Sequence, residues 1–125
     1  MIIIDGVTYN IPVSSIIRKA EFLDKSAGRT TSGDLKRRLL GVYFNYTINF
    51  GVGTDMNEYN NLYDKLTEAV EFHTVTVPDK DTSFTFTAYF STVQDRLVSS
   101  KNNINAVWSD LSLDFISKTP RRTPV

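Results

Sequence analysis

Apolar and polar residues alternate most clearly in two stretches of this 125-residue chain, Val42 to Phe50 and Ser83 to Val93. A period of two residues predicts a strand that buries one face and leaves the other in polar surroundings. Residues 72–77 continue the pattern, and the short, turn-rich link at 78–81 predicts an antiparallel hairpin with residues 83–93. The clearest patterning in the chain is therefore that of an antiparallel sheet.

The remaining segments extend this β-rich reading. Asp5-Gly6 between two β-branched runs predicts a tight hairpin of residues 2–4 and 7–9, because both central residues of such a turn adopt positive φ. The other expected segments are a long strand over 13–24, a loop over 26–34, a loop or a turn of helix over 95–105, and a last strand over 108–116.

One amphipathic helix is predicted after the strand that ends at Phe50. Asp55 is placed to cap its first turn, and Glu58 follows three residues later, as in a capping box. Apolar residues then recur at steps of three and four, which places them on one stripe: Met56, Tyr59, Leu62, Tyr63, Leu66 and Val70. We expect this stripe to face the sheet.

Together these elements predict an α+β fold that is mainly antiparallel β, with a β-sandwich-like architecture and one flanking amphipathic helix. The length fits a single β-rich domain over residues 1–117. Residues 118–125 contain two prolines and no apolar pattern, so we expect a flexible C-terminal tail that is mobile or is ordered by a partner.

Composition narrows the classes of partner. The 14 basic and 14 acidic residues give a formal net charge of zero, which makes nucleic acid an unlikely partner on charge alone. No apolar run approaches the length of a membrane helix, and the apolar opening stops at Asp5, too early for a signal peptide. We therefore expect a soluble protein that is made in the cytoplasm, with no membrane partner.

The chemistry-bearing residues predict no enzyme, no cofactor and no metal site. His73 is the single histidine and cysteine is absent, so a structural role for His73 is favoured over a catalytic or metal-binding one. Asp79 and Asp81 could bind calcium through oxygen atoms, but they lack the glycine and glutamate of a known calcium loop. The Gly28 to Gly33 spacing resembles a phosphate-binding loop, but Asp34 follows it instead of lysine.

Basic and aromatic residues at exposed positions instead predict an interaction surface. Arg29 lies near the basic run 36–38, and Arg121 and Arg122 form a second basic pair. Tyr43 and Tyr89 fall on the outward faces of their strands, a composition typical of a wet protein–protein interface. The candidate interface residues are Arg29, Tyr43, Tyr89, Arg121 and Arg122. A solvated surface with salt bridges remains the alternative.

Taken in order, the segments resemble those of small phage and prophage tail-associated structural proteins, of the tail-tube and distal-tail type. The matching segments are Ile3 to Tyr9, Ala27 to Thr30, Gly41 to Phe50, Glu58 to Leu66, Phe84 to Phe86 and Trp108 to Phe115. The resemblance implies a virion structural protein that is made in the bacterial host and is located in the tail. Its implied partners are other tail, baseplate or head–tail junction proteins, and a homo-oligomeric ring is a further implication.

A second hypothesis assigns the chain to ligand-binding proteins instead of structural proteins. The chain could be a small β-sandwich module that binds a carbohydrate or cell-surface ligand, with Tyr43 and Tyr89 as stacking platforms. A ligand module should stay monomeric and bind a glycan, whereas a tail component should associate with itself or with other tail proteins. A third reading, a nucleic-acid-binding accessory protein, predicts salt-dependent retention on DNA.

Overall fold

The computed structural model describes residues 2–51, 56–101 and 104–124, with side chains for all of these except 99–101, 104 and 105. These residues form one helix and a seven-stranded antiparallel sheet in the order β2-β1-β5-β6-β7-β4-β3. The strands are β1 (Ile2–Ile4), β2 (Val7–Tyr9), β3 (Val13–Arg29), β4 (Leu35–Phe50), β5 (His73–Asp79), β6 (Thr82–Lys101) and β7 (Ile104–Ser117), and the helix is α1 (Met56–Leu66).

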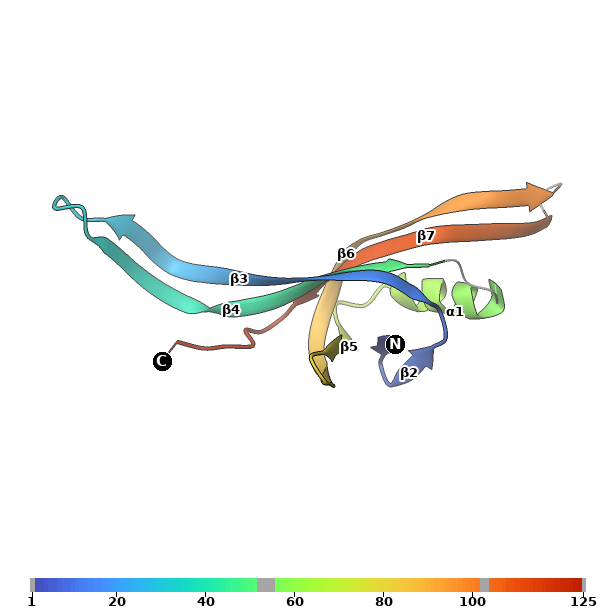
Figure 1. Ribbon diagram of the computed structural model, residues 1–125, viewed down its shortest axis with the longest axis horizontal. Helices are drawn as coiled ribbons and strands as arrows, with labels where there is room; N and C mark the ends of the chain where they lie inside the picture. Colours follow the sequence, from blue (N-terminus) through green and yellow to red (C-terminus); the bar gives the residue numbers. More distant parts are fainter. Residues whose placement is uncertain (1, 52–55, 102–103, 125) are drawn as a thin grey trace.

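The mainly antiparallel α+β class is confirmed. The strands belong to one open sheet, because β6 pairs with β5 near its beginning and with β7 along the rest of its length. Figure 1 shows β5 and the beginning of β6 turning away from the line of the other long strands. The bent sheet gathers the apolar faces of β1, β4, β5 and β7 into one core, and α1 packs against it. The core is therefore formed by a single open sheet and one helix.

The N-terminal hairpin is confirmed, and it forms one edge of the sheet. Asp5 and Gly6 both have positive φ, 50° and 82°, as a tight two-residue turn requires. Ile2 and Ile4 are almost fully buried, and β1 pairs on its other side with β5. A short strand pair therefore closes this edge, whereas the other edge is the 17-residue β3.

Two long hairpins extend from the core in opposite directions (Figure 1). In the first, β3 continues to Arg29 and pairs with β4 from Leu35 onward, so the loop predicted over 26–34 is limited to residues 30–34. In the second, β6 continues to Lys101 and β7 begins at Ile104, so the prediction of a loop or helical turn over 95–105 was wrong. Apolar and polar residues alternate along a strand only when one face of the strand is buried. The described residues near the outer ends of both hairpins are mostly exposed, so the pattern is absent there.

The helix is confirmed, and its predicted stripe faces the core. Tyr59, Leu62 and Leu66 are buried, while Val70 lies beyond the end of α1 and is exposed. The Asp55 cap lies outside the described residues. Glu58 Oε1 accepts a hydrogen bond from the backbone N–H of Asn10 at 3.0 Å, which ties the helix to the segment after β2.

Candidate interaction surface

The outer part of the β3–β4 hairpin, residues 18–40, has no core of its own, and we call it the basic arm. Phe22 is 58% exposed, and the other exposed large apolar side chains of this arm are Leu23, Leu35 and Leu40. Phe22 pairs with Val42 across the hairpin and Leu23 pairs with Gly41, so these two neighbours project from opposite faces of the ribbon. Apolar surface is therefore open to solvent on both faces.

The charge of the basic arm is strongly one-sided. Its residues include seven Lys or Arg and three Asp or Glu. Arg37 pairs with Asp24 at 2.6 Å and lies over the Phe22 ring, whereas Lys36 and Arg38 make no ion pair with any described residue. Arg29, a predicted interface residue, donates to the Gly33 carbonyl at 3.0 Å, so it helps to close the turn at the tip of the arm.

The C-terminal segment, residues 118–124, lies along the base of the basic arm, where the sequence predicts an extension that is mobile or ordered by a partner. The backbone N–H groups of Arg121 and Arg122 donate to the Val42 carbonyl, and Val42 donates back to Arg122. The Arg121 guanidinium lies 3.9 Å from the ring centre of Phe84 and 4.9 Å from that of Phe44. The sequence of this segment has two prolines and no apolar pattern. In the structure, backbone hydrogen bonds and cation–π contacts hold the segment against the sheet.

Asp79 joins this segment to the arm. Arg121 Nη2 lies 2.8 Å from Asp79 Oδ2, and Arg18 Nη1 lies 2.7 Å from Asp79 Oδ1. The hydrogen bond from Arg121 and the charges of both arginines hold the pKa of Asp79 below its usual value of 3.8. Asp79 thus acts within the fold as the anion between two arginines.

This ion cluster predicts an acid-dependent loss of stability. Because the folded-state pKa of Asp79 is lowered, its contribution is complete above about pH 4 and is lost as the pH falls through the folded-state value. Asp79→Asn should therefore show a shallower fall in the urea midpoint between pH 5 and pH 2, measured by circular dichroism. Asp81→Asn, in the same turn, is the matched control. An Asp79→Asn curve parallel to that of the unmodified protein would contradict this assignment.

The predicted tyrosines lie together on the sheet face opposite the C-terminal segment. Tyr43 is half-buried and Tyr89 is 42% exposed. Ile116 lies between them, because it lines a shallow pocket with Tyr43 and pairs with Tyr89 across β6 and β7. The structure therefore brings Tyr43 and Tyr89 near each other, places Arg121 and Arg122 on the other face, and leaves Arg29 at the tip of the arm.

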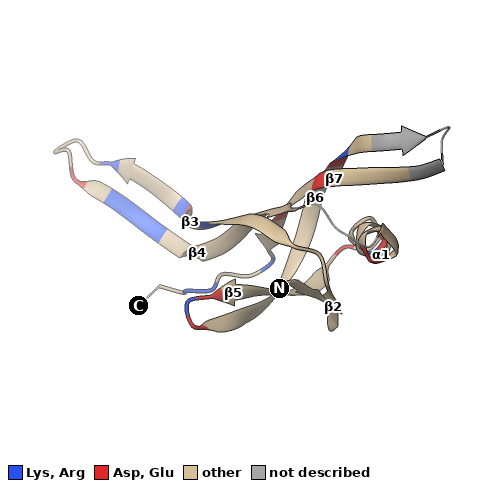
Figure 2. Ribbon diagram, turned by 45° about the vertical axis from the view of Figure 1, so that its right-hand side comes forward, with Lys and Arg blue, Asp and Glu red and all other residues tan. Residues whose placement is uncertain are grey.

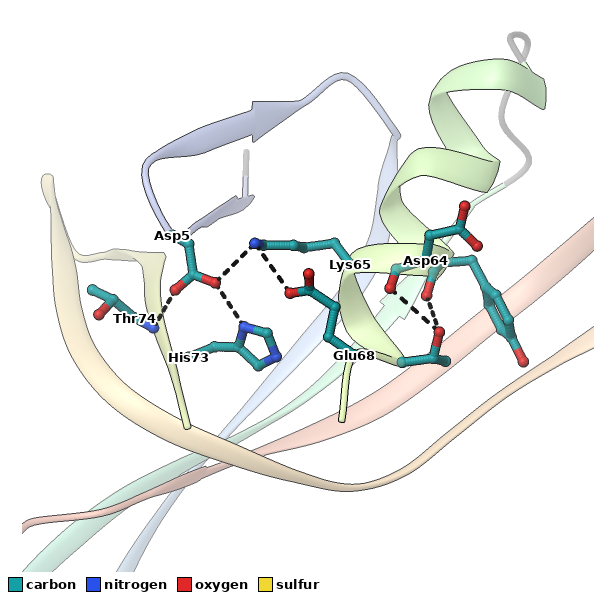
Figure 3. Close-up of polar contacts among 8 residues, drawn as sticks. Asp5, Asp64, Lys65, Glu68, His73 and Thr74 are labelled. Carbon is teal, nitrogen blue, oxygen red and sulfur yellow. Dashed lines mark hydrogen bonds and ion pairs between the residues drawn. The ribbon is translucent and has the colours of Figure 1, made fainter. Parts of the chain in front are cut away.

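His73 belongs to a polar cluster that fastens the N-terminal hairpin to the end of α1 (Figure 3). Its ring is buried, stacks on Phe90, and places Nδ1 2.7 Å from Asp5 Oδ2. Lys65 Nζ lies 3.3 Å from Asp5 and 3.1 Å from Glu68. Partial burial acts to raise the pKa of Asp5, but hydrogen bonds led by the one from His73 lower it overall.

This cluster contains the atoms from which a cation site could be built. One ligand atom each from Asp5, Glu68 and His73 lies within 4.8 Å of the others. The Lys65 ammonium already contacts both carboxylates, so part of the cluster's negative charge is offset from within the chain. Its arrangement is that of a structural network linking β1, β5 and α1.

Comparison with protein-family models, with curated proteins and with solved structures finds no match. Among the described residues, no helix combines the length and the apolar character that crossing a membrane requires. Sequence reasoning missed the outer ends of the two long hairpins, and the local signal at the end of the β3–β4 hairpin was the run of basic residues at 36–38 beside Leu35 and Leu40.

Proposed function

We propose that this chain is a structural component of a phage or prophage tail, acting by self-assembly or by docking to other tail proteins. The observation that carries the proposal is the pair of two-stranded arms that extend from opposite sides of the core with apolar side chains in solvent. A two-stranded ribbon is only marginally stable in water by itself. Exposed strand edges and apolar patches of this kind mark surfaces that another chain covers.

Both arms carry the relevant side chains. On the β3–β4 hairpin, Ile17 and Phe22 are more than half exposed, and on the β6–β7 hairpin Leu97 and Val98 are 46% and 53% exposed. The resemblance of the sequence segments to tail-associated proteins supports the same reading. On this proposal the mature protein is located in the virion tail, and its neighbours are other tail subunits or further copies of itself.

The ligand-module alternative has one observation in its favour. Tyr43 lines a pocket of about 200 Å³ together with Phe22, Leu23 and Ile116. This volume is below the roughly 300–1,000 Å³ that is usual for small-molecule sites, and the pocket lies on an exposed sheet face. We therefore favour assembly over glycan binding.

Size-exclusion chromatography with light scattering over a wide concentration range tests the proposal, with negative-stain imaging of any large species. We expect mass to increase with concentration and rings or tubes to appear. The increase should shrink when the exposed apolar pair Phe22 and Leu23 is replaced by serine, because less apolar area is then covered on association. A chain that stays monomeric, binds no tail protein and binds a glycan array would overturn the proposal.

A further inference from the structure

The zero net charge of this chain conceals a strong separation of charge. Residues 18–38 together with Arg121 and Arg122 hold nine of the 14 basic residues but three of the 14 acidic ones. The rest of the chain therefore carries five basic and 11 acidic residues. Figure 2 shows most of the blue segments along β3, β4 and the C-terminal segment, with α1 on the other side of the molecule.

The acidic excess is concentrated at α1 and the link to β5. Residues 56–72 contain four carboxylates and one lysine, and we call their exposed part the acidic surface: Asp64, Glu68, Val70, Glu71 and Phe72. Lys65 pairs with Glu68, and Lys118 lies over the Phe72 ring at 4.6 Å. Carboxylates still outnumber the neighbouring cations, and Val70 adds an apolar side chain that is 54% exposed.

The basic arm and the acidic surface are complementary in two respects. The arm offers exposed leucine and phenylalanine side chains beside Lys36 and Arg38, and the acidic surface offers Val70 and Phe72 beside carboxylates. Opposite charges around an apolar centre are the usual arrangement of a specific protein interface. The two surfaces cannot meet within one chain, because the arm extends away from α1 on the opposite side of the core (Figure 1).

We propose that the basic arm of one copy docks on the acidic surface of a second copy. The inference rests on the proposed self-assembly and specifies its geometry. Because each copy presents both surfaces, the contact is head-to-tail, and repeating it produces a closed ring or an open filament. Two identical arms would instead bring together like charges, which disfavours a symmetric arm-to-arm dimer.

Charge reversal tests this contact through the association constant, measured by light scattering or analytical ultracentrifugation. Lys36→Glu with Arg38→Glu reverses two charges at the beginning of β4 and lowers the net charge of the arm from four positive to zero, and Asp64→Lys with Glu71→Lys reverses the acidic surface. These four side chains make no ion pair with described residues, so the monomer should keep its urea midpoint. We expect each double variant to weaken association at least about tenfold, and the chain carrying all four changes to recover to within about threefold of the unmodified protein.

A charge reversal elsewhere is the matched control. Asp81→Lys reverses an exposed charge in the turn between β5 and β6, outside both arms and the acidic surface, and should leave association unchanged. An unchanged association constant in either double variant would overturn the arm-to-surface contact. Failure of the chain with all four substitutions to recover its association constant would also overturn it. Rings or tubes that persist in the reversed variants would overturn this contact alone. Open chains that depend on it, without rings, tubes or binding to tail proteins, would support the contact and overturn the tail function.

Discussion

Replacing Phe115 with alanine is expected to lower the free energy of unfolding by about 3–5 kcal/mol. Phe115 lies in β7 at the centre of the core, is 0% exposed, and stacks on Phe90 with ring centres 5.0 Å apart. Its removal leaves a cavity between the two halves of the bent sheet, and the surrounding strands can close it only in part. Urea denaturation followed by circular dichroism measures the loss.

The same substitution on the basic arm provides the control. Phe22 is 58% exposed, so Phe22→Ala should change the free energy of unfolding of the monomer by less than about 1 kcal/mol. Both measurements belong at a protein concentration where the chain is monomeric, because association would stabilise the folded state of either variant. Equal losses at the two positions would show that the arm is packed in the monomer, contrary to the structure.

Replacing Gly41 with alanine is expected to displace the C-terminal segment. A Cβ at this position would lie 2.6 Å from Pro120 Cβ and 3.0 Å from the Arg122 carbonyl oxygen. The segment must therefore move, which breaks the contacts of Arg121 with its aromatic neighbours. We expect a loss of about 1–3 kcal/mol in the free energy of unfolding, together with faster proteolysis after Lys118.

A truncated chain separates this steric explanation from others. In a protein that ends at Ser117 the added methyl group meets nothing from residues 118–125, so Gly41→Ala should be nearly neutral there. Gly28→Ala, on the arm, has open space around its Cβ and should change stability by less than about 0.5 kcal/mol in the full chain. A full loss in the truncated protein would show that the clash lies elsewhere.

The sequence was informative wherever one face of an element is buried. Phe50 and Ile48 alternate with asparagine and threonine, and Tyr59, Leu62 and Leu66 recur at helical spacing, so β4 and α1 were predictable. The Asp5-Gly6 turn was predictable from local backbone preference alone. The arms were not, because a ribbon that is exposed on both faces has no reason to alternate, as Leu97 and Val98 show.

The candidate interface was predictable only in part. The alternation of side chains along the strand predicts that Tyr89 is exposed, as it is in the structure. The residue types at 36–38 predict a basic segment. The role of Arg121 could not be inferred, since its partners Phe44, Phe84 and Asp79 come from three strands that are brought together only by the sheet order. Nor does linear sequence show that balanced charges are divided between two ends of the molecule.

The open edge of β3 has a consequence for the tendency of the free chain to aggregate. A long strand without an outer neighbour is a template for uncontrolled stacking with its own kind. Here the edge is interrupted by irregular pairing on both sides of Asp24, and Lys19 and Lys25 lie along it. Bulges and lysines are the devices by which natural sheets block amyloid-like growth, so the exposed edge of this strand is protected against such growth.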